Sequence, residues 1–250
     1  MSPRLPARRA GAAAFSALSL LALAAAAYIP SAASLVRRAA ARVHEGSRSK
    51  EATLSGWLWL GEKPAQAATL LLKFPLGCRL DAGKLGAAVG SRDPGRPQLQ
   101  DDGLGEGALD LLRLACPLIA YRGQTPPQGE QTLRQAALAA GVAPELAPTA
   151  LARLYDRVAI VLGAGPRQLD RPQLWLYKDN GAPARLLSRQ GERLDDLRLL
   201  QYGNPAAGEW FPRVLELWRG AALVARFEAL ETRGFADTDT GTADEDEARE

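Results

Sequence analysis

Apolar and polar residues alternate along much of the chain, and the period of the alternation changes from one region to the next. Over residues 53–60 the period is two, which places Trp57 and Trp59 on one face of a predicted strand and leucines on the other. Residues 69–74 form a second strand-like run, and the segment between the two runs suits a hairpin loop. Apolar residues within 34–45 recur at helical spacing instead. The pattern therefore predicts a helix followed by a β-hairpin.

The middle of the chain carries the longer period that is typical of helices. Leucine and alanine recur every three or four residues, which predicts helices over 107–115, 131–140 and 144–155. Pro117 is expected to end the first of these, because proline cannot donate a helical hydrogen bond. Residues 79–103 are rich in Gly, Pro, Asp and Arg, which indicates irregular loops around one short strand.

From residue 157 onward the pattern becomes a series of short strands separated by turn residues. The predicted strands cover 157–162, 173–178, 184–189, 195–202, 211–219 and 222–231. Asn180-Gly181 is a strong hairpin signal, because both residues accept positive φ. Connections this short cannot reach a parallel neighbour, so the strands form an antiparallel meander. Many of its strands are apolar on one face, and such a sheet needs a cover of helices, a second sheet or a ligand.

Composition divides the chain into three parts. A basic segment followed by an uncharged Ala/Leu run over 10–29 and then small residues has the layout of a secretory signal. We expect residues 1–33 to be a signal peptide that is cleaved after Ala27 or Ala33. The alternative is an inner-membrane anchor through 10–29, which is long enough to span a bilayer.

The remaining charge is divided between a tail and a single domain. Residues 236–250 are dominated by Asp and Glu and are expected to form a disordered acidic tail. Residues 34–235 form one basic domain, although the whole chain has a net charge of only +3. Its arginines are dispersed and export separates it from nucleic acid, so we expect no nucleic-acid partner. Peripheral contact with anionic membrane surfaces suits the charge better, and we expect a monomer.

Composition also excludes much enzyme chemistry. The chain has one histidine, His44, and two cysteines, so a multi-histidine metal site and a four-cysteine zinc site are excluded. No Gly-x-Ser-x-Gly elbow is present, and no nucleophile is matched with a base. We therefore expect a protein that is not an enzyme and has no cofactor. Asp195 and Asp196 are adjacent and should point to opposite faces of a strand, as solvated residues at its start.

Two sets of residues remain as candidates for a specific role. The aromatic candidates for lining an apolar ligand pocket are Trp57, Trp59, Trp175, Tyr177 and Trp218. The alternative for each aromatic residue is an ordinary place in the core or on the sheet surface. Cys78 and Cys116 either pair in an oxidising compartment or remain two small buried hydrophobic residues, and their spacing does not decide between these states.

Three segments of the C-terminal strands carry a family resemblance. They are Gln173–Leu187, with Pro183-Ala-Arg185 after an Asp-containing turn, Asp195–Tyr202, and Gly208–Trp218, with Trp210-Phe-Pro212 opening a strand. The sequence of these segments resembles that of the periplasmic outer-membrane lipoprotein-sorting proteins, the LolA/LolB-like lipoprotein carrier family. The specific resemblance is confined to about residues 172–231, while the order of elements is similar over most of the domain.

The resemblance implies an α+β fold, an antiparallel half-open β-barrel of about eight or nine strands covered by short helices. It further implies that acyl chains of lipoproteins or lipids bind in an apolar concave cavity, with the helices as a lid. The implied role is that of a periplasmic carrier or sorting protein. The alternative on the same fold is a non-carrying envelope module that binds a protein partner in stress sensing or assembly. No lid-contacting arginine of the family can be matched to a residue of this chain.

Overall fold

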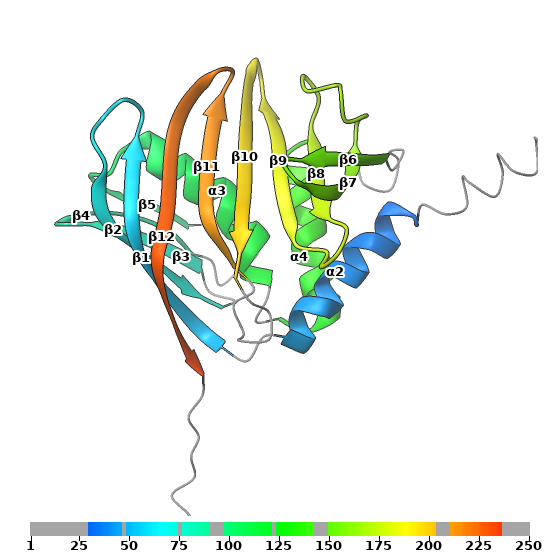
Figure 1. Ribbon diagram of the computed structural model, residues 1–250, viewed down its shortest axis with the longest axis horizontal. Coiled ribbons are helices and arrows are strands. Elements are labelled where there is room, and N and C mark those ends of the chain that lie inside the picture. The colour runs from blue at the N-terminus through cyan, green and yellow to red at the C-terminus, as the bar shows by residue number, and fades with distance from the viewer. Residues whose placement is uncertain are drawn as a thin grey trace, which may run out of the picture.

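One large antiparallel sheet and three helices make up the part of the chain that the computed structural model describes, residues 30–46, 49–74, 77–90, 98–121, 124–142, 150–203 and 211–236 (Figure 1). The helices are α2 (Ala32–Gly46), α3 (Glu106–Ala120) and α4 (Pro126–Ala139). The strands are β1 (Ser49–Leu60), β2 (Gln66–Lys73), β3 (Gly77–Ala82), β4 (Leu85–Gly90), β5 (Gln98–Asp102), β6 (Ala150–Leu154), β7 (Arg157–Gly163), β8 (Gln173–Tyr177), β9 (Pro183–Gln190), β10 (Arg193–Tyr202), β11 (Pro212–Arg219) and β12 (Ala222–Ala236).

The twelve strands lie in the order β5-β4-β3-β2-β1-β12-β11-β10-β9-β8-β7-β6. Strands that are neighbours in sequence pair antiparallel, except β5 and β6, and β12 returns to pair with β1. The sheet is therefore open, with β5 and β6 at its edges. This confirms the predicted antiparallel fold with helical covering, although the sheet is larger than the eight or nine strands expected. The one short strand expected within 79–103 is β4, and the additional strands are β3 and β5 on either side of it and β6 at the other edge of the sheet.

Two of the predicted helices were wrong in part. Helix α3 continues through Pro117 to Ala120, because Leu118 and Ile119 beyond the proline are buried in the core and stabilise the last turn. The predicted helix over 144–155 is a strand where the structure describes it, since residues 150–154 form β6 and pair with β7. The leucines of this segment fit either period, and pairing along the sheet edge decides the outcome. Residues 143–149 lie outside the described residues.

Side chains alternate between a helix-covered inner face and an outer face of the sheet. On β1, Leu54 and Leu58 are fully buried in the main core, whereas Trp57 on the other face is 41% exposed. Gly56 lies between them where β1 meets β12 most closely: a Cβ atom there would lie 1.9 Å from the carbonyl oxygen of Glu228. Glycine is therefore required at this register shift in the β1–β12 ladder.

The helices differ in what they cover. Helix α3 lies against β3–β5 and β9–β12 and buries Leu111, Leu112 and Leu118 against the inner face. Helices α2 and α4 pack mainly on each other, toward the end of the sheet that holds β7–β9 (Figure 1). Among the described helices, none combines the length and the hydropathy of a membrane span.

The predicted processing segments lie mostly beyond the described chain. Residues 1–29 and 237–250 are outside the described residues, so the signal peptide and the acidic tail stay predictions. The same holds for the side chain of His44, although its backbone belongs to α2. Cleavage after Ala33 would remove the first two residues of α2, whereas cleavage after Ala27 would leave this helix complete.

Candidate functional site

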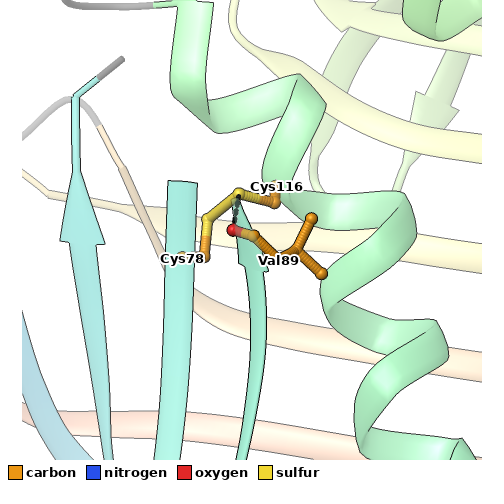
Figure 2. Close-up of a disulfide and its surroundings, with 3 residues drawn as sticks. All are labelled: Cys78, Val89 and Cys116. Carbon is orange, nitrogen blue, oxygen red and sulfur yellow. Dashed lines mark hydrogen bonds between the residues drawn. A yellow bond between two sulfur atoms is a disulfide. The ribbon is translucent and has the colours of Figure 1, made fainter. Parts of the chain in front are cut away.

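Helix α3 is joined covalently to the sheet. Cys116 on α3 and Cys78 on β3 form a disulfide with a Cα–Cα distance of 5.8 Å (Figure 2). Both cysteines are buried, and Sγ of Cys116 lies 3.8 Å from the carbonyl oxygen of Val89 on β4. The two cysteines are therefore paired in a disulfide and are not two separate buried thiols. The bond fixes the second half of α3 against β3 and β4.

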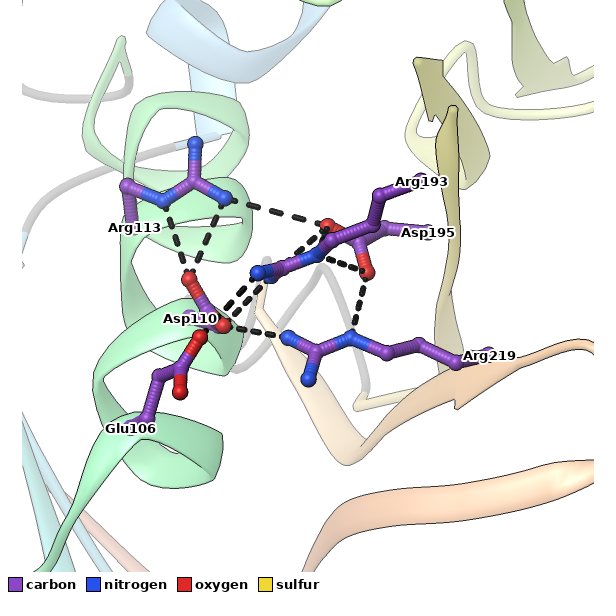
Figure 3. Close-up of polar contacts among 6 residues, drawn as sticks. All are labelled: Glu106, Asp110, Arg113, Arg193, Asp195 and Arg219. Atoms are coloured by element: carbon purple, nitrogen blue, oxygen red, sulfur yellow. Dashed lines mark hydrogen bonds and ion pairs between the residues drawn. The ribbon is translucent and has the colours of Figure 1, made fainter. Parts of the chain in front are cut away.

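A network of buried and half-buried charges holds the first half of α3 (Figure 3). Asp195 on β10 is 1% exposed and accepts hydrogen bonds from Arg193 at 3.0 Å and from Arg219 on β11 at 2.8 Å. Asp110 on α3 accepts from both of these arginines and from Arg113, at 3.2 Å, one helical turn away. The hydrogen bond to Asp195 raises the pKa of Arg193 above its usual value. Two carboxylates shared among three arginines thus connect α3 to β10 and β11.

Asp195 and Asp196 point to opposite faces, as expected, but neither is a solvated residue. Asp196 on the outer face is 9% exposed and accepts hydrogen bonds from Arg185 at 2.6 and 2.7 Å and from Arg198 at 3.0 Å. The expectation of solvated carboxylates was therefore wrong. Its physical reason is that their arginine partners lie mostly on other elements, so a pattern along a single strand does not reveal them.

Helix α4 is held differently from α3. Its N-terminus is capped by reciprocal bonds between Thr125 and Gln128, and Leu133 and Ala137 are fully buried. Its main neighbours are α2 and α3 rather than strands. An exposed Arg37–Glu130 ion pair at 3.2 Å links it to α2, and the backbone N–H of Arg189 on β9 donates to the carbonyl oxygen of Ala140, the residue after the helix, at 3.4 Å.

A crevice of about 450 Å³ lies between α3, α4 and β9. Its apolar wall consists of Leu114 and Pro117 from α3, Ala136, Leu138 and Ala139 from α4, and Leu186 from β9. Gln135 also lines the crevice, and its buried Oε1 accepts no hydrogen bond from the described residues. The volume falls within the range of small-molecule pockets. The arrangement suits an apolar chain that carries one polar group with a donor.

The aromatic candidates do not gather around this crevice. All five lie on outer-face positions, since each alternates along its strand with a residue of the main core. Arginines stack on three of the four tryptophans: Arg185 over Trp175, Arg198 over Trp218 and Arg226 over Trp59, with distances of 5.2, 5.1 and 5.6 Å from the guanidinium carbon to the ring centre. None of the five lines the crevice, and Tyr177 lines a smaller cavity beside α2.

Tyr177 belongs to a second, smaller core on the outer face, together with Trp175. Burial raises the pKa of Tyr177 to about 12, although the positive charge of Arg157, 3.8 Å from the ring centre, lowers it in part. The hydroxyl of Tyr177 donates to the carbonyl oxygen of Leu199 at 3.4 Å. In the described part of the chain, no three His, Cys, Asp or Glu side chains are grouped as metal ligands.

The crevice residues were missed by sequence reasoning because they are ordinary alanines and leucines of amphipathic helices. Aromatic residues attract attention as pocket candidates, but here they occupy the outer face. The only available signal was the small-residue run Ala136-Ala137-Leu138-Ala139 on α4, which leaves room beside the helix.

No protein-family model matches the chain, and no curated protein matches it either. Solved structures match over most of its length. A LolA superfamily protein from Nitrosomonas europaea is 12% identical, with 82% of this chain and 94% of that chain covered and a TM-score of 0.43. The chain is similar to LolA-like proteins. This is the resemblance that the C-terminal strands predicted.

Two further solved structures are similar to the chain. A putative outer membrane lipoprotein-sorting protein domain from Vibrio parahaemolyticus is 11% identical, with coverage of 85% and 94% and a TM-score of 0.45. A DUF1329 family protein from Desulfovibrio piger is 11% identical, with coverage of 86% and 96% and a TM-score of 0.47. At this identity the likeness concerns the fold.

Proposed function

We propose that this protein is an exported periplasmic protein that binds an acyl chain of a lipid or lipoprotein and acts in its carriage or sorting. The observation that carries the proposal is the apolar crevice of about 450 Å³ between α3, α4 and β9, on the concave side of the open sheet. The function requires binding and release and no covalent step. Helix α4 is the part of the cover that moves, because it packs mainly on α2 and α3, whereas a disulfide and a charge network tie α3 to the sheet.

The hydrophobic effect favours the replacement of α4 by an acyl chain as the cover of the apolar surface. Each CH₂ group that leaves water contributes about 0.8 kcal/mol. Displacing α4 exposes Leu133 and Ala137, which are fully buried in the closed structure. A chain that enters the crevice covers the same apolar surface, so the cost of opening is largely offset. Release then requires an acceptor that covers the chain in turn.

The disulfide between Cys78 and Cys116 supports an oxidising compartment such as the periplasm. The signal-like N-terminal segment supports the same location. The basic domain suits peripheral contact with an anionic membrane surface, where a lipid or lipoprotein is collected or delivered.

Displacement of a fluorescent fatty-acyl probe from the delipidated protein tests the proposal. Ala136 lines the crevice, so Ala136→Trp fills it, and we expect the probe Kd to rise at least about tenfold. Gln131→Trp is the matched control, because Gln131 is exposed on the same helix and does not line the crevice. Equal binding by both variants and the unchanged chain would contradict the proposed site, and absence of any probe binding would contradict the function.

A second candidate is a non-carrying envelope module that binds a protein partner. The observation that favours it is that α3 fills much of the concave face with its own side chains, among them the fully buried Leu111 and Leu112. This candidate predicts a defined partner in crosslinking within the envelope and no lipid in native mass spectra of the purified protein. Bound lipid in those spectra would favour the acyl-chain binder.

A further inference from the structure

A second cavity, separate from the crevice beside α4, lies between α2 and the strands β7 and β8. Its volume is about 270 Å³, and Leu35, Ile160 and Leu176 form its apolar wall. Arg38 and Lys178 also line it, and none of its lining residues is acidic. The cavity therefore combines an apolar interior with positive charge from two different elements.

The two neighbouring arginines of α2 have different surroundings. Arg37 forms an ion pair with Glu130 of α4 at 3.2 Å and does not line the cavity. Arg38 lines the cavity, and its guanidinium has no hydrogen bond or ion pair with any described residue. An arginine fork that is free of protein carboxylates is well suited to a phosphate group, which it binds through paired hydrogen bonds.

The apolar wall of the cavity points to a lipid as the source of this phosphate, because inorganic phosphate has no apolar part for Leu35, Ile160 and Leu176 to cover. The cavity is smaller than most ligand pockets, so it accommodates part of one chain rather than a whole lipid.

We infer that this cavity is a binding site for an anionic phospholipid, with part of one acyl chain against Leu35, Ile160 and Leu176 and the phosphate against Arg38. Lys178 adds positive charge on the opposite wall. Positive charge at both walls disfavours a lipid whose headgroup carries its own ammonium group, and so gives the site a preference for net negative headgroups. The site thereby adds a headgroup specificity that an apolar crevice alone does not provide.

Two single-chain lipids with the same tail test the inference: 1-lauroyl lysophosphatidylglycerol, which is anionic, and 1-lauroyl lysophosphatidylcholine, which is zwitterionic. Binding to the protein as purified from the envelope is measured by calorimetry below the concentration at which either lipid forms micelles. We expect the anionic lipid to bind about tenfold more tightly, the effect of about one charge-assisted hydrogen bond. The preference should fall as salt is added.

Arg38→Gln should reduce the preference to less than about threefold, and Arg38→Glu should abolish or reverse it. Arg37→Gln is the matched control and should leave the preference unchanged, because Arg37 does not line the cavity. Arg38 is exposed, so its variants are expected to fold, and thermal melts check this. An equal affinity for the two lipids, or a preference that survives both Arg38 variants, would overturn the inference.

A second pair of variants separates this inference from the proposed function. Ile160→Trp fills the cavity under α2, whereas Ala136→Trp fills the crevice beside α4. Loss of the anionic preference in Ile160→Trp, with retention in Ala136→Trp, supports the inference whether or not the crevice also binds a chain. The reverse pattern overturns the inference and leaves the proposed function standing. If Ile160→Trp does not fold, the two Arg38 variants decide the question alone.

Discussion

Helices α3 and α4 both cover the concave face of the same sheet, yet they are attached to it in different ways. Helix α3 has a disulfide from Cys116 to β3 and a charge network from Asp110 to β10 and β11. Helix α4 relies on packing against other helices and on the exposed Arg37–Glu130 ion pair. The cover therefore has one fixed part and one releasable part. In the proposed function, an acyl chain enters by displacing α4, while α3 remains as a wall of the crevice.

This difference has a measurable consequence for local stability. Elements that are held by few buried contacts open at a lower free energy than the global unfolding of the domain. For α3 the tethers make local opening and global unfolding nearly the same event. For α4 a separate opening at lower free energy is expected.

The largest expected effect is the loss of the covalent tether. Replacing both Cys78 and Cys116 with alanine removes a crosslink that spans 38 residues. A loop of this length corresponds to a destabilisation of about 4 kcal/mol. Urea unfolding of the oxidised protein and the double variant measures it, and the wild-type protein under reductant is the control. A loss below about 1 kcal/mol would show that packing alone fixes α3.

The next effect concerns the charge network. Asp195→Asn removes the buried carboxylate shared by Arg193 and Arg219, and we expect a loss of about 3 kcal/mol because two half-buried arginines are left without a full partner. Asp196→Asn is the matched control, since it breaks a similar cluster on the outer face.

Hydrogen exchange of α3 distinguishes the two variants. The Asp195 variant should let α3 exchange faster, and the Asp196 variant should not do so beyond its effect on global stability. Equal acceleration of α3 exchange in the two variants would mean that the network is not a specific tether of this helix.

A leucine-to-alanine substitution in each helix compares α3 and α4 directly. Leu133 on α4 and Leu111 on α3 are both fully buried, and replacing either with alanine should cost about 2–3 kcal/mol of packing energy. For Leu133→Ala most of this cost should appear as easier opening of α4, and acyl-probe association should become faster in stopped-flow measurements. Leu111→Ala should leave that rate unchanged. Equal rates in the two variants would argue against α4 as the entry element.

The smallest effect is expected at the surface link between α2 and α4. Glu130→Gln removes the ion pair with Arg37 and weakens the bond to Arg134 one turn along α4. Pairs of this exposure are worth less than about 1 kcal/mol. The thermal midpoint should barely change, while exchange in α4 should accelerate slightly. A large fall in the midpoint would mean that α4 is fastened more firmly than its contacts indicate.

The sequence predicted the secondary structure that a local hydrophobic period encodes. It did not predict the contacts between residues that are far apart in the chain. The C-terminal meander and its alternating faces follow from a period of two and from turn residues such as Gly181, which has φ of +72°. The one short strand expected within 79–103 is β4, whereas β3 and β5 were missed because Gly, Pro, Asp and Arg dominate that segment, and β6 was predicted as a helix. The pairing of Asp195 and the bridging of Cys78 to Cys116 depend on where α3 docks, which no local pattern reveals.

At the candidate site, too, local patterns were predicted and the contacts between distant residues were not. Trp57 and Trp59 were correctly placed on one face of a strand, but the period alone does not say which face meets the helices. The larger aromatic residues lie on the outer face, where arginines stack on several of them. The crevice arises instead where small residues of α4, such as Ala136 and Ala139, face Leu186 across a gap. Tertiary packing sets that gap.

Native-state hydrogen exchange, resolved by peptide and followed with and without 1-lauroyl lysophosphatidylcholine, tests the division of the cover most directly. Without lipid, residues 126–139 should exchange through an opening of lower free energy than residues 106–120. Addition of the lipid should change exchange in residues 126–139 and in β9 and leave residues 106–120 unchanged. Equal opening free energies for the two helices, or a lipid effect confined to residues 106–120, would contradict a fixed α3 and a releasable α4.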